Sequence, residues 1–232
     1  LVETSYLRRR LVAAGPALSD LDGASAASGA ELSAWLLGGL RVRHRGREIT
    51  PYLQGRLGDL MALLLLQPSD KALARGEIAA LFWPDTLDGQ ALTNVRNLLH
   101  KLRTVWPEVG DVLEITRQQV QWKVRPGAGI WTDVDAFERG VAEAGRLSGA
   151  AAIHLLRTSL ELYTGDLLPA ASDAWALAWQ ERLRARRLAA LGRLVDLLIE
   201  RHDFAAALHY SQLMVAAAPC DEEPYRQLMR AH

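Results

Sequence analysis

The sequence has one cysteine, Cys220, and its apolar stretches are far shorter than the roughly 20 residues that a membrane-spanning helix needs. A single cysteine excludes a disulfide framework and a multi-cysteine zinc site, and it is typical of a protein from a reducing cytoplasm. Net charge is also absent, with 27 basic and 27 acidic side chains. We therefore expect a cytoplasmic protein without a membrane partner, and only the placement of charge can favour nucleic acid.

Signals of enzyme chemistry are missing as well. None of the six histidines stands at a metal-ligand spacing from another histidine, a cysteine or an acid, and no base accompanies Cys220 as a thiol nucleophile would require. No glycine-rich loop is followed by Lys and Ser or Thr, so a phosphate-binding loop is excluded. We expect no catalysis, no metal and no cofactor.

The first 125 residues combine helix and strand signals. Within residues 1–34 the sequence predicts a basic helix over residues 1–15 and a linker of small residues over 16–34, and Arg8, Arg9 and Arg10 in that helix favour an ordinary polar face over a site for an anion or DNA. Residues 35–125 predict a winged helix-turn-helix with an N-terminal sheet. Its expected elements are two strands within 35–50, helices at 57–66, 75–83 and 88–106 with Asp88 as the N-cap of the third, and strands at 112–116 and 120–124.

The strand signal ends at the Pro126–Gly129 break, and residues 131–232 predict an all-α domain of tetratricopeptide-like helix pairs. The overall fold class is mainly α with a small β part. We expect a piece of a longer protein, with this helical domain truncated at its C-terminal end. The helices are predicted at 133–146, 150–163, 173–200, 203–217 and 221–230.

The strongest binding signal lies in the third helix of the first domain. Residues 36–123 hold 12 basic and 9 acidic side chains, and no carboxylate occurs from Gln90 to Arg103. Advancing 100° per residue predicts a buried stripe of Leu92, Val95, Leu98, Leu99 and Leu102. The outer face carries Thr93, Asn97, His100, Lys101 and Thr104, with Asn94 and Arg96 beside it. Such side chains suit base edges and phosphates, so we predict a DNA-reading helix over an ordinary solvated face.

Two basic hairpins are weaker candidates. Arg117 and Gln118, followed by Gln119, form the predicted tip between residues 112–116 and 120–124, and they suit either a DNA-contacting wing or a plain polar turn. Arg43, Arg45 and Arg47 are predicted on one face of a strand, where a solvated edge is favoured over DNA contact.

These motifs together resemble a known family. Residues 36–124 are similar to the response-regulator-type winged helix of SARP-type regulators, through Leu37–Val42, Ala80–Asp85, Ala91–Arg103 and Ile115–Trp122. Residues 131–232 resemble the bacterial transcriptional activator domain, through Trp131–Glu138, Tyr163–Pro169, Trp179–Leu183 and Asp221–Met229.

The resemblance implies a transcription regulator that binds double-stranded promoter DNA, often at direct repeats, and acts through RNA polymerase. Dimerisation on tandem half-sites is implied in the same way. The alternative is a protein-interaction module, in which the helical repeats bind a partner and the winged helix serves as a docking surface.

Overall fold

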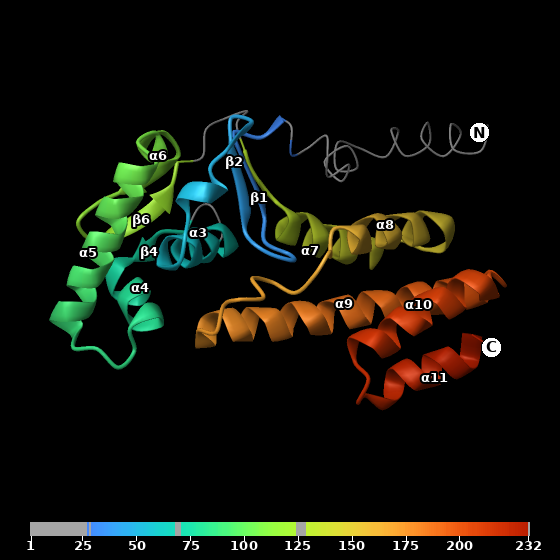
Figure 1. The fold of residues 1–232 in the computed structure, drawn as a ribbon. Coiled ribbons are helices and arrows are strands. Elements are labelled where there is room, and N and C mark those ends of the chain that lie inside the picture. The colour runs from blue at the N-terminus through green and yellow to red at the C-terminus, as the bar shows by residue number, and fades with distance from the viewer. Residues whose placement is uncertain (1–26, 28, 68–70, 124–128, 232) are drawn as a thin grey trace. The chain divides into compact units, whose positions relative to one another are not determined.

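A computed structural model describes residues 27, 29–67, 71–123 and 129–231 (Figure 1). The described residues pack into two compact units. The first unit contains residues 27–132 and 167–179, and the second contains residues 133–166 and 180–231. No helix in the described part of the chain is long and apolar enough to cross a membrane.

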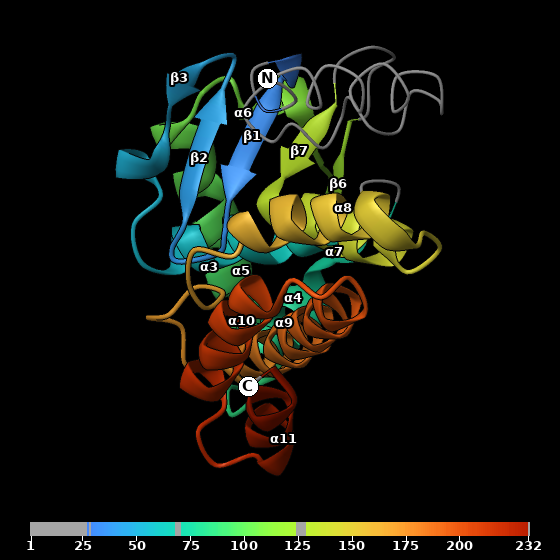
Figure 2. The same cartoon turned by 90° about the vertical axis from the view of Figure 1, so that its right-hand side faces the viewer.

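A four-stranded sheet opens the first unit. Strands β1 (Leu32–Trp35), β2 (Arg41–His44) and β3 (Arg47–Glu48) are antiparallel neighbours, and β7 (Ile130–Thr132) pairs with β1 in parallel. Figure 2 shows the resulting order β3-β2-β1-β7. Alternation in β2 buries Val42 and His44 and exposes Arg41 and Arg43, as one covered face requires.

Helix α3 (Arg56–Leu66) is the centre of the unit, because nine of its eleven residues are buried. It follows a short 3-10 turn, η2 (Thr50–Tyr52), and ends at Leu66. Helices α4 (Arg75–Phe82), α5 (Asp88–Val105) and α6 (Val109–Val112) come next. A second sheet has the order β4-β6-β5, built from Leu73–Ala74, Gln119–Trp122 and Leu113–Ile115.

The strands differ from expectation in two places. The linker predicted over residues 16–34 is wrong at its end, because β1 begins at Leu32, whose apolar side chain is fully buried. The parallel strand β7 was not predicted at all. Ile130–Thr132 is too short to show a periodicity, and its partner β1 lies about 100 residues earlier in the sequence. The expected helix over residues 1–15 lies outside the described residues.

Residues 167–179, which include the connection between the helices at 149–161 and 174–200, pack against the winged-helix elements. Leu168 donates its backbone N–H to the carbonyl of Leu36 at 3.1 Å, and Asp173 forms an ion pair with Arg56. The ring of Trp175 lies 6.0 Å from that of Phe82, centroid to centroid. Residues 167–179 therefore complete the first compact unit, although along the chain they lie between the two stretches of the second, residues 133–166 and 180–231.

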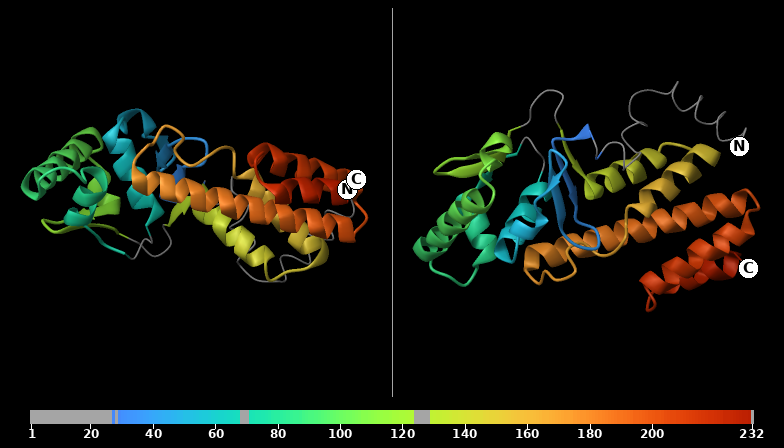
Figure 3. Two further views of the ribbon diagram at one scale, coloured as in Figure 1. Left: turned by 90° about the horizontal axis from the view of Figure 1, so that it is seen from below. Right: turned by 45° about the horizontal axis from the view of Figure 1, so that its top comes forward.

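The second unit is built from helices, all close to their predicted ranges. They are α7 (Asp133–Ala144), α8 (Gly149–Glu161), α9 (Ala174–Glu200), α10 (Phe204–Ala217) and α11 (Glu222–Ala231). The start of α9, residues 174–179, belongs to the first unit. Helices α7 and α8 form one hairpin and α10 and α11 another, as the yellow and red ribbons of Figure 3 show. Their shared core includes Leu156 of α8, Leu194 and Leu198 of α9, and Met214 of α10.

The Tyr163–Asp166 stretch fixes the end of α8 against α9. Tyr163 meets the ring of Phe137 edge-on at 5.5 Å, and Arg187 lies 4.7 Å over the tyrosine ring. Burial, reinforced by the negative charge of Asp166, raises the pKa of Tyr163 to about 12. Arg184 donates to Asp166 at 2.6 Å, and this bond is the main reason that the pKa of Asp166 is lowered. This conspicuous sequence motif therefore has a packing role.

Candidate nucleic-acid interface

Helices α4 and α5 form the helix-turn-helix, joined by Trp83–Leu87. Pro84 cannot continue α4, which ends at Phe82. The backbone N–H groups of Gln90 and Ala91 both donate to the carbonyl of Leu87 at 2.9 Å, so α5 starts one residue earlier than predicted. Asp88 is thus the first helical residue and not the N-cap, which is Leu87 without a side-chain cap. Its carboxylate still lies at the positive end of the helix dipole.

The inner face of α5 matches the prediction in four of five apolar positions. Val95, Leu99 and Leu102 are buried and Leu98 is half-buried, whereas Leu92 is 41% exposed. The prediction for Leu92 is wrong because Ala91, and not Leu92, continues the buried stripe toward the start of α5. Leu92 lies about 60° around the helix from Val95, at the edge of the stripe.

The outer face of α5 is polar and open. Arg96, Asn97, His100 and Lys101 are exposed, and their side chains form no hydrogen bond or ion pair with any other described residue. An unoccupied amide and guanidinium on an exposed helix face are free to bind an external partner. No acid competes for them on α5, since Asp88 in its first turn is the only carboxylate of the helix.

The remaining predicted residues of this face bond locally. Thr93 is half-buried and donates to the carbonyl of Gly89 at 2.8 Å, and Thr104 donates to that of His100 at 3.1 Å. Asn94 is half-buried and accepts from Nε2 of Gln90 at 3.1 Å. These contacts fix side-chain orientation while leaving the Asn94 amide nitrogen available. Gln90, exposed on the same face, was not among the predicted site residues.

Strands β5 and β6 form the hairpin expected as a wing. The Thr116 hydroxyl accepts from the backbone N–H groups of Gln118 at 3.3 Å and Gln119 at 3.1 Å, which fixes the turn. Arg117 and Gln118 are exposed at its tip. The hairpin therefore presents a cation and an amide on a turn of defined geometry.

The hairpin is tied to both helices of the helix-turn-helix. Arg103 of α5 donates from Nη2 to the carbonyl of Ile115 at 3.0 Å. The backbone N–H of Arg75, which opens α4, donates to the carbonyl of Gln118 at 2.8 Å. Strand β4, just before Arg75, pairs with β6. The recognition helix and the hairpin tip are thereby held in one arrangement.

These contacts gather positive charge that the sequence prediction missed. The pKa of Arg75 is lowered mainly by burial and then by the positive charges of Arg103 and Arg96. The Nε of Arg75 is buried without a hydrogen-bond partner among the described residues. Arg96 and Arg103 are seven residues apart, which is about two helical turns, so the sequence alone indicates that they share one face of α5. The approach of Arg75 depends on tertiary structure and has no such signal.

The basic N-terminal hairpin corrects a further expectation. Arg43, Arg45 and Arg47 do not lie on one strand, because Arg45 occupies the β2–β3 turn with a φ of 49°. Its guanidinium contacts Glu31 at 2.7 Å and Asp111 at 3.2 Å. Arg43 instead lies over the ring of Trp35, 5.4 Å from its centroid. The three arginines therefore either form contacts within the unit or are exposed at its edge.

A small hollow of about 340 Å³ lies beside this hairpin and the end of α5. His44 is buried there, with its ring centroid 5.2 Å from that of Trp106 in an edge-to-face arrangement. Burial, and then the positive charge of Arg45, lowers the pKa of His44, although Glu31, Glu108 and Asp111 oppose the shift. The described residues contain no cluster of three or more histidine, cysteine or acidic side chains that could hold a metal ion.

Comparison with known proteins adds two findings. The family model described as the bacterial transcriptional activator domain matches residues 132–232. A solved structure of Mycobacterium tuberculosis EmbR, in complex with a low affinity phosphopeptide, aligns with a TM-score of 0.70 at 17% identity. The alignment covers 87% of this chain and 54% of that one, so the chain spans about half the length of this structural relative. No curated protein matches the sequence.

Proposed function

Because the family model of the bacterial transcriptional activator domain matches residues 132–232, as the sequence resemblance predicted, we propose that this chain is a sequence-specific DNA-binding activator. Residues 35–125 bind promoter DNA as a winged helix, and residues 131–232 act on RNA polymerase. Two copies occupy promoter repeats as a dimer on DNA. The activity belongs in the cytoplasm and involves no catalysis and no cofactor.

The single observation that carries the proposal is the open, acid-free outer face of α5. Asn97 suits a bidentate contact to adenine and Arg96 one to guanine, and both side chains are free of partners within the described residues. His100 and Lys101 lie one turn further along the helix. We assign base contacts to Arg96, Asn97 and the Asn94 amide, and supporting contacts to Thr93, Thr104 and His100.

Phosphate contacts have a second set of candidates. Lys101, Arg117 and Gln118 suit the backbone on either side of the groove that α5 enters, because contacts to phosphate position a protein without reading sequence. The positive charges of Arg103 and Arg96 add to the lowering of the pKa of Arg75 by burial, and none of the three guanidinium groups has a carboxylate partner among the described residues. A phosphate placed between the helix and the hairpin would relieve that repulsion.

One observation favours the alternative function, a docking surface for protein. Leu81, Leu87 and Leu92 around the α4–α5 turn are exposed, and Leu87 is exposed to 85%. Exposed apolar side chains in a group mark protein contacts more often than DNA contacts. In our proposal these leucines are compatible with a polymerase contact made while α5 is bound to DNA.

Selection of duplexes from a random pool by the full chain tests the proposed function. We expect enrichment of one motif, present as two half-sites with fixed spacing, followed by protection of both half-sites in footprinting. A control chain with Asn97→Ala, Lys101→Ala and Arg117→Ala together should enrich nothing. If the unaltered chain recovers no motif but binds immobilised RNA polymerase, the docking alternative is correct.

A further inference from the structure

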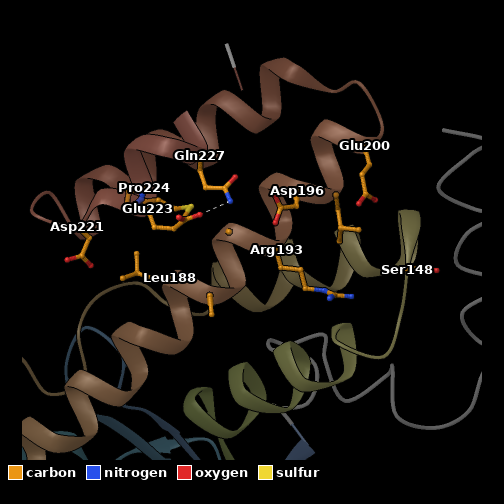
Figure 4. A pocket seen from close by; sticks show the side chains of 13 residues that line it. Ser148, Leu188, Arg193, Asp196, Glu200, Asp221, Glu223, Pro224 and Gln227 are labelled. Carbon is orange, nitrogen blue, oxygen red and sulfur yellow. Dashed lines mark hydrogen bonds between the residues drawn. The ribbon is translucent and has the colours of Figure 1, made fainter. Parts of the chain in front are cut away.

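A groove of about 780 Å³ lies in the helical unit, which contains none of the elements proposed to bind DNA. As Figure 4 shows, α9 forms one wall and the α10–α11 hairpin the other. Its apolar lining includes Leu188, Leu197 and Met214. At Gly192 of α9 no side chain fills the groove, and a Cβ there would lie 3.6 Å from the terminal methyl of Met214.

The rim of this groove is acidic. Asp196 and Glu200 line it from α9, and Asp221 and Glu223 line it from the start of α11. Asp196 is paired with Arg230 at 2.9 Å, and Glu223 pairs with Arg226 at 3.8 Å and accepts from Nε2 of Gln227 at 3.2 Å. The carboxylates of Glu200 and Asp221 form no hydrogen bond or ion pair with any described residue.

The one cation that lines the groove does not neutralise this rim. Arg193 points its guanidinium to the end of α7, where Nη2 donates to the carbonyls of Ala144, Gly145 and Leu147 at 3.3, 3.5 and 3.0 Å. These oxygens lie at the negative end of the α7 dipole and hold the arginine charge. The groove therefore favours an occupant that is both basic and apolar.

We propose that this groove binds the basic N-terminal segment of the same chain, residues 6–12. That segment reads Tyr-Leu-Arg-Arg-Arg-Leu-Val, so Arg8–Arg10 stand between Leu7 and Leu11. It lies outside the described part of the chain, and its sequence is what complements the groove. Guanidinium groups pair with the rim carboxylates, while Leu7 and Leu11, four residues apart, contact the apolar wall.

Residues 13–26 connect this segment to Ala27, and at about 3.3 Å per residue they can extend over roughly 46 Å. Docking in this groove keeps the three arginines away from other anions, including DNA phosphates.

The single cysteine provides the test in the full chain. Cys220 is exposed and directly precedes Asp221 on the groove rim, so a nitroxide attached there reports on the groove. We expect paramagnetic broadening of the backbone amide signals of residues 6–12 at low salt. The signals should recover in about 1 M NaCl, where the Debye length falls to about 3 Å.

Three variants identify the contact. Glu200→Lys reverses a rim charge, Gly192→Leu fills the apolar wall, and Arg8→Glu with Arg9→Glu and Arg10→Glu reverses the segment, and each should abolish the broadening. Glu161→Lys, at an exposed acid of α8 outside the groove, is the matched control and should preserve it.

Broadening that is absent in the unaltered chain, or that survives Glu200→Lys and Gly192→Leu while both variants stay folded, overturns the proposal. Broadening that grows with protein concentration assigns the segment to a second copy and overturns the intramolecular contact. Neither result bears on DNA binding, since the groove and the proposed reading face are measured separately.

Discussion

Salt dependence of DNA binding gives the most quantitative prediction. Arg75, Lys101, Arg103 and Arg117 lie around the proposed reading face, and none has a carboxylate partner among the described residues. If each neutralises one phosphate, the logarithm of the binding constant falls with that of the salt concentration with a slope of about −3.6 per bound copy. Raising monovalent salt from about 50 to about 200 mM then weakens binding by roughly 150-fold.

Fluorescence anisotropy on a selected duplex measures this slope. Lys101→Ala should make it shallower by about 0.9 and should weaken binding to all duplexes to a similar extent, because a phosphate contact carries no sequence information. Arg186→Ala is the control, since Arg186 is an exposed cation of α9 in the helical unit. A slope shallower than about −1 in the unaltered chain would refute the assignment of these cations to phosphate.

Two further predictions concern stability. Gly58→Ala should lower the free energy of unfolding by about 1–3 kcal/mol, because its Cβ would lie 2.8 Å from the carbonyl oxygen of Leu53. The same change at Gly192, inside α9 with room for a methyl group, should raise it by about 0.5–1 kcal/mol, so equal signs in urea unfolding would contradict the packing. Burial lowers the pKa of His44 below its usual 6.5, so protonation favours the unfolded chain and stability falls as pH drops below that value. Below this pH the unfolding temperature of His44→Phe should depend less on pH than that of the unaltered chain. If the two unfolding temperatures fall in parallel, His44 is not the group responsible.

The elements of the chain were predictable wherever amphipathic periodicity was strong. Helices α9 and α10 were placed within a residue or so, because long apolar stripes and acidic or proline boundaries mark their ends. The short strand β7 was not predicted because its pairing with β1 is parallel and remote in sequence. The packing of residues 167–179 against the winged-helix elements was not predicted for the same reason, since no local pattern encodes it.

The candidate interface was predictable on α5 and incomplete beyond it. The acid-free face at Asn97 and Lys101 follows from one helix and its 100° period. Arg75 joins that face only because β4 and the start of α4 are hydrogen-bonded to the hairpin. Leu92 shows the limit of a projection, which gives direction but not whether a neighbouring element covers that direction.

The central claim is that α5 reads base identity through Asn97. Repeating the duplex selection with Asn97→Ala tests it most directly, because one bidentate contact discriminates a base by about 1–3 kcal/mol, or roughly 5- to 150-fold. We predict that preference is lost at one base pair of each half-site and retained elsewhere. A motif identical to that of the unaltered chain, selected at the same stringency, would contradict the assignment of α5 as the reading helix.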